Sequence, residues 1–391
     1  MKEKYVILRE PARPRGPVAG PTGGTSTDAA LQVEVDELDR RASRAVAARR
    51  DVRAVAPVIP MRLILPVPRP EDAEPAAEGV AWGITAVKAD QSPFDGSDVV
   101  VAVLDTGIAN QHPAFAGVTL VERDFTGEGN GDTHGHGTHC AGTVFGRDVE
   151  GTRIGVAPGV KKALIGKVLG NDGGGSDAIV RAINWAVEEG AHVISMSLGI
   201  DFPGFVDLLI TQQGLPIDLA TTVALEGYRQ NVLLFERLAA LVRAREAFGE
   251  TTVIVAAAGN ESRRDENADF EIACSPPAVS EGLISVAALG RSGTRYSVAP
   301  FSNTNVIVSG PGVGIQSARH TGGLVAMSGT SMATPHVAGV AALWMQRLAQ
   351  DGPVPGSLLA SRLIASGTTA DVTGTFDVAD VGSGMVQSPL A

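Results

Sequence analysis

The sequence VVVAVLDTG at residues 99–107 decides the fold class. Its first six residues are apolar without alternation, which is typical of a strand buried on both faces of a sheet. Asp105 closes this strand, and Thr106 and Gly107 turn the chain away, so the backbone holds the carboxylate at the edge of the sheet. Taken alone, Asp105 could equally be a solvated turn residue.

Similar apolar runs follow along the chain, at residues 164–168, 192–198, 252–258 and 283–288. Helix-compatible stretches lie between them. In residues 176–189, for example, apolar side chains recur at helical spacing, and Ser176 is placed to cap the first turn. Buried strands that alternate with helices predict an α/β fold with a mostly parallel central sheet and helices on both faces. In such a sheet, ligands bind at the edge where the strands end.

The first 80 or so residues have a different pattern. A Pro-rich stretch at residues 57–75 cannot continue a helix or a strand and is typical of a linker. Before it come an apolar run at residues 5–8, a Pro/Gly-rich loop at 11–24 and a stretch at 31–35 that alternates as a strand would. A helix-compatible stretch at 36–50 and another strand candidate at 52–59 follow. We therefore expect a small α+β unit with its linker at residues 1–78 and a larger domain at 79–391.

Charge separates the same two parts. The net charge is −11, but residues 1–75 carry 13 basic and 11 acidic side chains, so the remainder holds −13. Opposite signs would favour docking of one part on the other, although drift in composition explains the difference equally well. The acidic total argues against nucleic acid as a partner. Apolar residues, at 44%, suffice for a sizeable core.

No targeting or spanning segment is evident. The charged start leads into only four apolar residues at 5–8, and no stretch approaches the roughly 20 apolar residues of a membrane helix. We therefore expect no membrane association and a cytoplasmic location, with secretion as the alternative. Cys140 and Cys274 allow one disulfide at most, and nothing in the sequence indicates that they meet.

Two further strings carry chemistry, HGHGTHCAG at residues 134–142 and GTSMATP at 329–335. Glycines on both sides of His136 would let a substrate backbone approach its ring. A zinc site is the alternative, because His134, His136, His139 and Cys140 are all competent ligands. No second ligand cluster and no His-Glu-x-x-His helix accompanies them, which argues against metal.

Ser331 heads a helical stretch that runs to about residue 348. The N–H groups and the dipole of a helix start stabilise negative charge on a reacting carbonyl oxygen. An ordinary helix cap would have the same local sequence. A hydroxyl is a weak nucleophile unless a base lies within hydrogen-bond reach and a carboxylate orients that base.

Asp105, His136 and Ser331 occur in an order that resembles the subtilisin-like serine proteases, from about residue 82 to the C-terminus. The resemblance implies a three-layer α/β fold in which Asp105 orients His136, His136 activates Ser331, and Asn260 of AAAGN donates to the oxyanion; a turn Asn is the alternative. It implies a serine endopeptidase that needs no cofactor. The family often holds structural calcium, but no complete set of calcium ligands is evident in the sequence.

Two glycine-containing strings fit the binding of an extended peptide through its main chain. They comprise Gly173, Gly174 and Gly175, and Ser197, Leu198 and Gly199. The glycine run could instead be a flexible loop or a phosphate cradle, although no Gly-Lys-Ser/Thr follows. Residues 195–199 and 256–259, which include Ala258 and Gly259, should wall the first pocket. Small uncharged walls favour an apolar residue before the scissile bond.

The N-terminal unit resembles the prodomain of the family, which assists folding and lays its tail through the cleft; an unrelated accessory domain is the alternative. The resemblance implies autoproteolysis between Leu65 and Gly83. Residues 200–250 form a mainly helical insertion, either packed on the core or gating substrate. We expect a monomer acting on polypeptides. There are two rival functions. One is transpeptidation by the same three residues, and the other is non-catalytic binding by a protein whose cleft stays filled by residues 1–80.

Overall fold

The computed structural model describes residues 2–10, 32–69 and 79–391. In this part of the chain an eight-stranded sheet runs in the order β15-β14-β13-β11-β6-β9-β7, with β16 also paired to β14. Its pairs are parallel except β14 with β15. The strands are β6 (Val100–Asp105), β7 (Thr119–Asp124), β9 (Lys162–Lys167), β11 (Val193–Met196), β13 (Val253–Ala257), β14 (Ile284–Ser292), β15 (Arg295–Val298) and β16 (Val308–Pro311).

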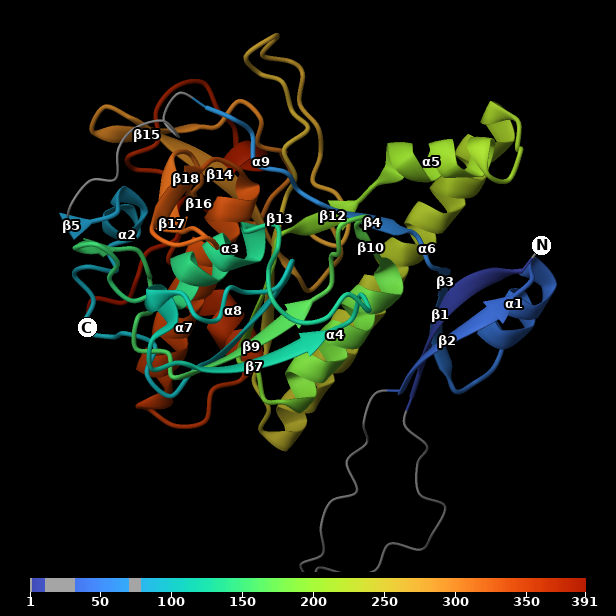
Figure 1. The fold of residues 1–391 in the computed structure, drawn as a ribbon, viewed down its shortest axis with the longest axis horizontal. Coiled ribbons are helices and arrows are strands. Elements are labelled where there is room, and N and C mark those ends of the chain that lie inside the picture. The colour runs from blue at the N-terminus through green and yellow to red at the C-terminus, as the bar shows by residue number, and fades with distance from the viewer. Residues whose placement is uncertain (1, 11–31, 70–78) are drawn as a thin grey trace, which may run out of the picture.

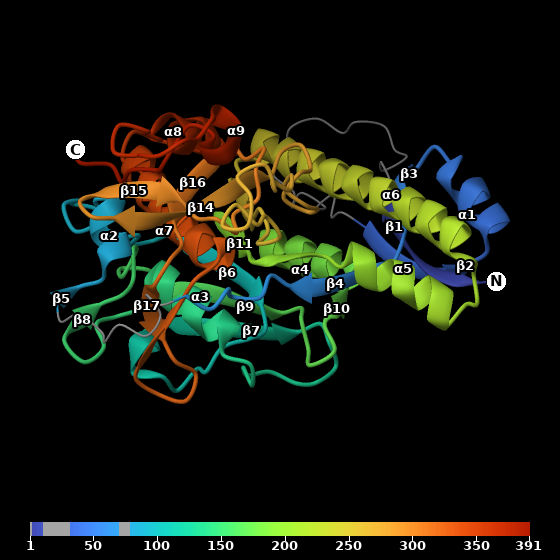
Figure 2. The same cartoon turned by 90° about the horizontal axis from the view of Figure 1, so that it is seen from above.

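Helices cover both faces of this sheet, which confirms the three-layer α/β prediction (Figure 2). Side chains of β6 alternate between two hydrophobic clusters, Val101 and Val103 on one face and Ala102 and Leu104 on the other. The first cluster includes α3 (His136–Phe145), α7 (Thr330–Ala349) and α8 (Gly356–Ala365). The second includes α4 (Ser176–Glu188) and α6 (Ile217–Ala244). Since both faces of β6 are buried, this strand is apolar without alternation, as the sequence indicated.

The predicted strand at residues 192–198 is divided between two sheets. Its first part, β11, belongs to the central sheet, and β12 (Leu198–Ile200) belongs to a small sheet in the order β10-β4-β12. The other members are β4 (Pro60–Leu63) and β10 (Gly174–Gly175), and both pairs are antiparallel. The chain therefore leaves the core at Ser197 and forms an edge to which β4 is added.

The N-terminal unit is a three-stranded antiparallel sheet in the order β2-β1-β3 with one helix. Its elements are β1 (Glu3–Arg9), β2 (Gln32–Leu38), α1 (Arg40–Ala47) and β3 (Val52–Pro57). The helix expected from residue 36 begins later, because β2 continues to Leu38 and Asp39 caps α1 by accepting from the N–H groups of residues 41 and 42. The loop predicted at residues 11–24 lies outside the described residues.

The unit lies against α4 and α6 at one end of the molecule (Figures 1 and 2). Val6, Leu8 and Ala56 are fully buried and continue the hydrophobic cluster beneath those helices. Asn231 of α6 is buried and donates from Nδ2 to the carbonyl of Pro57 at 2.9 Å. Apolar contact therefore carries this docking. Among the described residues, the ion pairs that join the first 78 residues to the larger domain come from the segment after β3, where Arg62 pairs with Asp201 and Glu261 and Arg69 pairs with Asp265.

The insertion at residues 200–250 is helical, as expected. It contains α5 (Phe202–Thr211), α6 and a short 3₁₀ turn at Arg245–Phe248. Leu234, Leu238 and Val242 of α6 are buried in the core, so the prediction of a helix packed on the core is confirmed. Because the same helix contacts β3, the insertion also supports the N-terminal unit.

The remaining elements surround the sheet. They are β5 (Gly79–Val80), α2 (Trp82–Ala86), a 3₁₀ turn at Pro113–Phe115, β8 (Thr152–Arg153), the hairpin of β17 (Ile315–Ala318) and β18 (Leu324–Met327), and α9 (Val378–Val381). Within the residues that the structure describes, every helix is too short or too polar to cross a membrane.

Candidate active site

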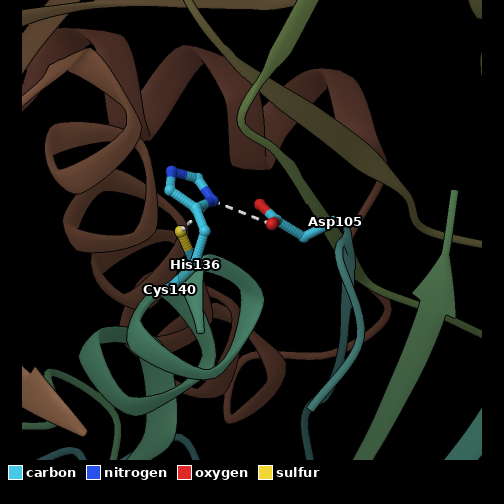
Figure 3. Close-up of side chains that lie close together, drawn as sticks. All are labelled: Asp105, His136 and Cys140. Carbon is cyan, nitrogen blue, oxygen red and sulfur yellow. Dashed lines mark hydrogen bonds and ion pairs between the residues drawn. The ribbon is translucent and has the colours of Figure 1, made fainter. Parts of the chain in front are cut away.

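The end of β6 and the start of α3 bring an acid and an imidazole together. Asp105 is the last residue of β6 and His136 the first of α3. His136 Nδ1 lies 2.8 Å from Asp105 Oδ1, and Figure 3 shows the ring turned toward the carboxylate. Both residues are almost fully buried, at 1% and 0% exposure. The N–H of Thr106 also donates to Asp105 Oδ1, at 2.8 Å, which fixes the carboxylate.

Gly137 makes this approach possible. A Cβ added there would lie 2.3 Å from the carbonyl oxygen of Gly107 and 3.2 Å from the Cβ of Asp105. Any side chain would therefore push α3 away from the end of β6. Gly135, with φ of 96°, starts the helix in the left-handed region that favours glycine. The two glycines around His136 serve this close packing, in addition to any approach by substrate.

The pKa of His136 reflects two opposing effects. Burial is the largest single effect and lowers the pKa, but the charge and hydrogen-bond interactions with Asp105 and Cys140 together outweigh it and raise the pKa well above its ordinary value. The pair therefore stabilises the protonated imidazolium, which is the form that a general base takes after it removes a proton.

Ser331 lies in the same site, at the second position of α7. The Sγ of Cys140, beneath the His136 ring in Figure 3, lies 3.8 Å from His136 Nδ1 and 3.4 Å from the Ser331 carbonyl oxygen. The hydroxyl of Ser331 donates to the carbonyl of Ile64, at 2.9 Å. His136 Nε2 is buried without a hydrogen-bond partner among the described residues. The hydroxyl is thus engaged by the chain that occupies the cleft.

Asn260 also contacts the chain segment that occupies the cleft, one residue after Ile64. Its Oδ1 accepts from the N–H and the hydroxyl of Thr330, each at 2.9 Å. This orientation directs Nδ2 into the cleft, where it donates to the carbonyl of Leu65 at 2.9 Å. The sequence pattern did not identify Thr330 as the residue that orients Asn260. The only sequence signal that could have identified it is that a threonine directly precedes the candidate nucleophile Ser331.

The predicted peptide-binding edges hold β4. Gly174 pairs with Met61 and Gly175 with Pro60 on one side, while Leu198, Gly199 and Ile200 pair with Leu63, Arg62 and Met61 on the other. A Cβ on Gly173, which has φ of 86°, would lie 2.7 Å from the Met61 carbonyl oxygen. The glycine run therefore forms neither a free loop nor a phosphate cradle in this state. Ser176 does not cap α4 as predicted, because its hydroxyl instead accepts from the N–H of Ile59 at 3.2 Å.

The other predicted wall residues hydrogen-bond to the candidate catalytic segment or to its neighbours. The Ser197 hydroxyl donates to the carbonyl of Ser331 at 3.2 Å. The N–H of Gly259 donates to the hydroxyl of Thr330 at 3.2 Å, and the carbonyl of Ala258 accepts from Asn303 Nδ2 at 3.2 Å. These groups connect α7 to the strand ends and so position Ser331 relative to Asn260.

Asp132 is a structural residue that the sequence pattern did not identify. It accepts from the hydroxyls of Thr106 and Thr138 at 2.9 and 2.6 Å, and from the N–H groups of His134, Gly135 and Thr138. Burial opposes its ionisation, but these hydrogen bonds prevail and lower its pKa. An aspartate a few residues before a helix start is a common capping signal, and here it holds the loop that presents His136.

The alternative four-residue zinc set does not assemble. His139 places its Nε2 2.8 Å from the carbonyl oxygen of Ile315, and His134 is exposed. Asp105, His136 and Cys140 do bring ligand atoms within 4.8 Å of one another. Burial raises the pKa of the Cys140 thiol, which favours the neutral thiol in this arrangement. Cys140 and Cys274 are both free thiols.

Known proteins resemble this chain over much of its length. A sequence profile of the Subtilase family matches residues 96–368. A thermostable alkaline protease of Halalkalibacterium halodurans is 33% identical over 278 residues, 69% of this chain and 64% of that protein. Subtilisin DY of Bacillus licheniformis is 33% identical over 69% of this chain and 86% of its own length. Thermitase of Thermoactinomyces vulgaris is 34% identical, over 64% and 75% respectively.

The matched profile covers the region that holds all three catalytic candidates, and the relatives give no support to the cytoplasmic location expected from the sequence. The family profile covers well over half of the chain, from just before β6 to just after α8. The chain therefore belongs to the subtilase family of subtilisin-like serine proteases.

Proposed function

We propose that this protein hydrolyses internal peptide bonds through an acyl-enzyme on Ser331. The contacts of Asp105 with His136, and of Asn260 with a cleft carbonyl, support these roles. Asp105 holds Nδ1 of His136, which leaves Nε2 free to accept a proton. Asn260 supplies a hydrogen bond to the oxygen that becomes negatively charged.

The proposed reaction runs in two halves. The Ser331 oxygen bonds to the carbonyl carbon while His136 Nε2 takes the hydroxyl proton. The tetrahedral oxyanion is stabilised by Asn260 and the N-terminus of α7, and it collapses as His136 returns the proton to the leaving amine. Water then adds to the ester with His136 again as base, and the carboxylic acid leaves Ser331. An amine in place of water would give transpeptidation.

The observation that carries this proposal is the binding of the chain's own segment in the cleft. β4 lies antiparallel between β10 and β12, as an extended substrate would. Its continuation meets Ser331 Oγ and Asn260 Nδ2 at two adjacent carbonyls. Ile64 is only 4% exposed, and its Cγ1 lies 3.7 Å from a Cβ built on Gly199. This contact supports a preference for an aliphatic side chain at that position.

We further propose that residues 1–78 form an inhibitory prodomain and that residues 79–391 form the peptidase domain. Maturation would then require a cut in the linker at residues 65–83, of which residues 70–78 lie outside the described part. The buried contact of Val6, Leu8 and Ala56 with the cluster beneath α4 and α6 supports this division. So does β4, which blocks the cleft to any other peptide.

Hydrolysis of denatured casein would test the peptidase proposal. After cleavage of the linker, we expect wild type and Ser361→Ala to release peptides and Ser331→Ala to release none. Before cleavage, all three should show the same circular dichroism spectrum. Ser361 is the matched control because it is an exposed serine on α8, outside the candidate site. Full activity in Ser331→Ala would refute the mechanism. No hydrolysis by any chain, even after cleavage of the linker, would favour the non-catalytic binding protein.

We also propose that the reaction needs no cofactor, because each proton transfer is assigned to a side chain of this protein. Dialysis against EDTA should leave casein hydrolysis unchanged. Loss of activity that calcium restores would instead indicate a structural cation site.

A further inference from the structure

The cleft segment engages the two catalytic groups through two different carbonyls. Ser331 Oγ donates to the carbonyl of Ile64, whereas Asn260 Nδ2 donates to the carbonyl of Leu65, each at 2.9 Å. In a productive complex the nucleophile and the oxyanion donor must meet at one carbonyl, because the attacked group is the one that becomes negatively charged. Neither carbonyl in this segment has both partners.

Each side of this segment is anchored. On the upstream side, β4 pairs with β12, and the guanidinium of Arg62 lies 3.1 Å from Asp201 and 3.2 Å from Glu261. On the downstream side, the N–H of Val67 donates to the carbonyl of Ser328 at 2.8 Å. Between these anchors the Ile64 side chain is buried, whereas Leu65 is 62% exposed. With both sides held, the segment between the anchors contains one residue, Leu65, too many for Ser331 and Asn260 to meet at the same carbonyl.

Pro66 blocks the first way of correcting the register. To carry the Ile64 carbonyl to Asn260, the downstream chain must move by one residue, so that residue 66 would face the Ser328 carbonyl in place of Val67. Proline has no N–H and cannot make that hydrogen bond. Its ring also restricts the backbone of the residue before it to extended conformations. The slide would therefore lose the downstream anchor.

The second correction is also unfavourable. To carry the Leu65 carbonyl to Ser331, β4 must slip by one residue against its neighbours, and a one-residue slip turns every side chain to the opposite face. Ile64 would lose its buried position, and Arg62 would leave its two carboxylates. The bond then presented would be Leu65–Pro66, whose nitrogen carries the proline ring at the place where His136 must deliver a proton.

We propose that residues 60–67 are a built-in inhibitor that Ser331 cannot cut while they are docked, because Pro66 holds them in this split register. The inference rests on the proposed peptidase function and specifies its regulation. The bonds on either side of Leu65 stay intact in the resting protein. The cut that frees the cleft therefore falls elsewhere in the chain.

Intact-mass spectrometry of the full chain over time tests this. Pro66→Ala restores an N–H, so we expect that variant to split between Ile64 and Leu65. Cleavage of the same bond in wild type should be slower by about 10²–10³, the factor measured when a subtilisin loses its oxyanion asparagine. Pro68→Ala, which changes an exposed proline two residues away, should behave as wild type. Adding Ser331→Ala to Pro66→Ala should abolish the split.

Peptides of residues 60–69, with proline or alanine at position 66, provide a measurement that does not depend on the folding of a variant. Added to protein whose linker has been cleaved and whose cleft is open, the alanine peptide should be cut after Ile64. The proline peptide should inhibit casein hydrolysis by the same protein without being cut. Wild type that splits beside Leu65 as fast as Pro66→Ala would overturn the inference. So would Pro66→Ala chains and alanine peptides that stay whole while casein is hydrolysed through Ser331. Absence of all Ser331-dependent hydrolysis would instead refute the peptidase proposal itself.

Discussion

Two aspartates, Asp105 and Asp132, lie close together at the site and are bonded in opposite ways. Asp105 Oδ1 contacts His136 and the N–H of Thr106, while its Oδ2 is buried without a partner among the described residues. Both oxygens of Asp132 are engaged, by donors from Thr106, His134, Gly135 and Thr138. One carboxylate acts on an imidazole and the other holds a loop.

The difference separates a chemical role from a structural one. A fully hydrogen-bonded carboxylate is stabilised in its charged form and has little capacity left for a reacting group. A carboxylate with one free oxygen beside a buried histidine retains its influence on the charge of that ring. Thr106 touches both, since its N–H donates to Asp105 and its hydroxyl donates to Asp132. Substitutions at these three residues should therefore have different readouts.

The largest expected effect is on catalysis, from Asp105→Asn. An amide can hold His136 in the wrong tautomer, so kcat should fall by about 10⁴, as the same change does in another serine protease triad. Removal of the negative charge should also lower the pKa of His136, and the acid limb of any residual activity should move to lower pH. Casein hydrolysis against pH measures both. An unchanged kcat would show that Asp105 does not orient the base.

Asp132→Asn should chiefly reduce stability. The amide N–H₂ cannot accept the hydrogen bonds from the N–H and hydroxyl of Thr138, and each buried donor left unpaired costs about 1–3 kcal/mol. The free energy of unfolding, measured with urea, should fall by more than it does in Asp105→Asn. Equal losses in the two variants would remove the distinction between the two carboxylates.

Thr106→Val should cause a smaller loss of stability. The change keeps the N–H bond to Asp105 but removes the hydroxyl that donates to Asp132 and accepts from the N–H of Gly137. One unpaired buried N–H costs about 1–3 kcal/mol. Serine at this position restores the hydroxyl, so Thr106→Ser should recover most of the stability. Failure of that rescue would assign the effect to lost packing instead.

The smallest effect concerns pH. Because the pKa of Asp132 is lowered in the folded state, its contribution to stability is present above the pKa of the unfolded chain and is lost as pH falls through the folded pKa. Between about pH 5 and the acid limit, wild type should therefore lose more of its unfolding free energy than Asp132→Asn does. Parallel curves for the two chains would contradict the assignment.

Much of the peptidase fold followed from local pattern. Mainly apolar runs correctly predicted β6, β9, β13 and β14 to within a few residues, because a strand buried on both faces has few polar positions. Helical spacing likewise placed α4 and α7. The strand at 192–198 was only partly correct, because the chain changes sheets at Ser197, and that change depends on which neighbour each half pairs with.

The candidate site was predictable as a set of residues but incomplete as an arrangement. Motif order named Asp105, His136, Ser331 and Asn260. It did not name Thr330, which orients Asn260, or Asp132, which holds the loop before α3. Both act through hydrogen bonds to residues whose own positions depend on the packing of α3 and α7 against strand ends. No single stretch of sequence contains that information.

The sequence by itself determined the α/β class and the three catalytic candidates, because these depend on local periodicity and motif order. The family resemblance placed the tail of the N-terminal unit in the cleft, but only the tertiary structure decided which of its residues meet the candidate catalytic groups and in which register. Ile64 and Ser331 are 267 residues apart, and the sequence does not show their contact. Nor does it show that Asn260 donates to the carbonyl of Leu65 instead of that of Ile64. The register of a bound strand depends on all of its anchors together, and those anchors come from distant parts of the chain.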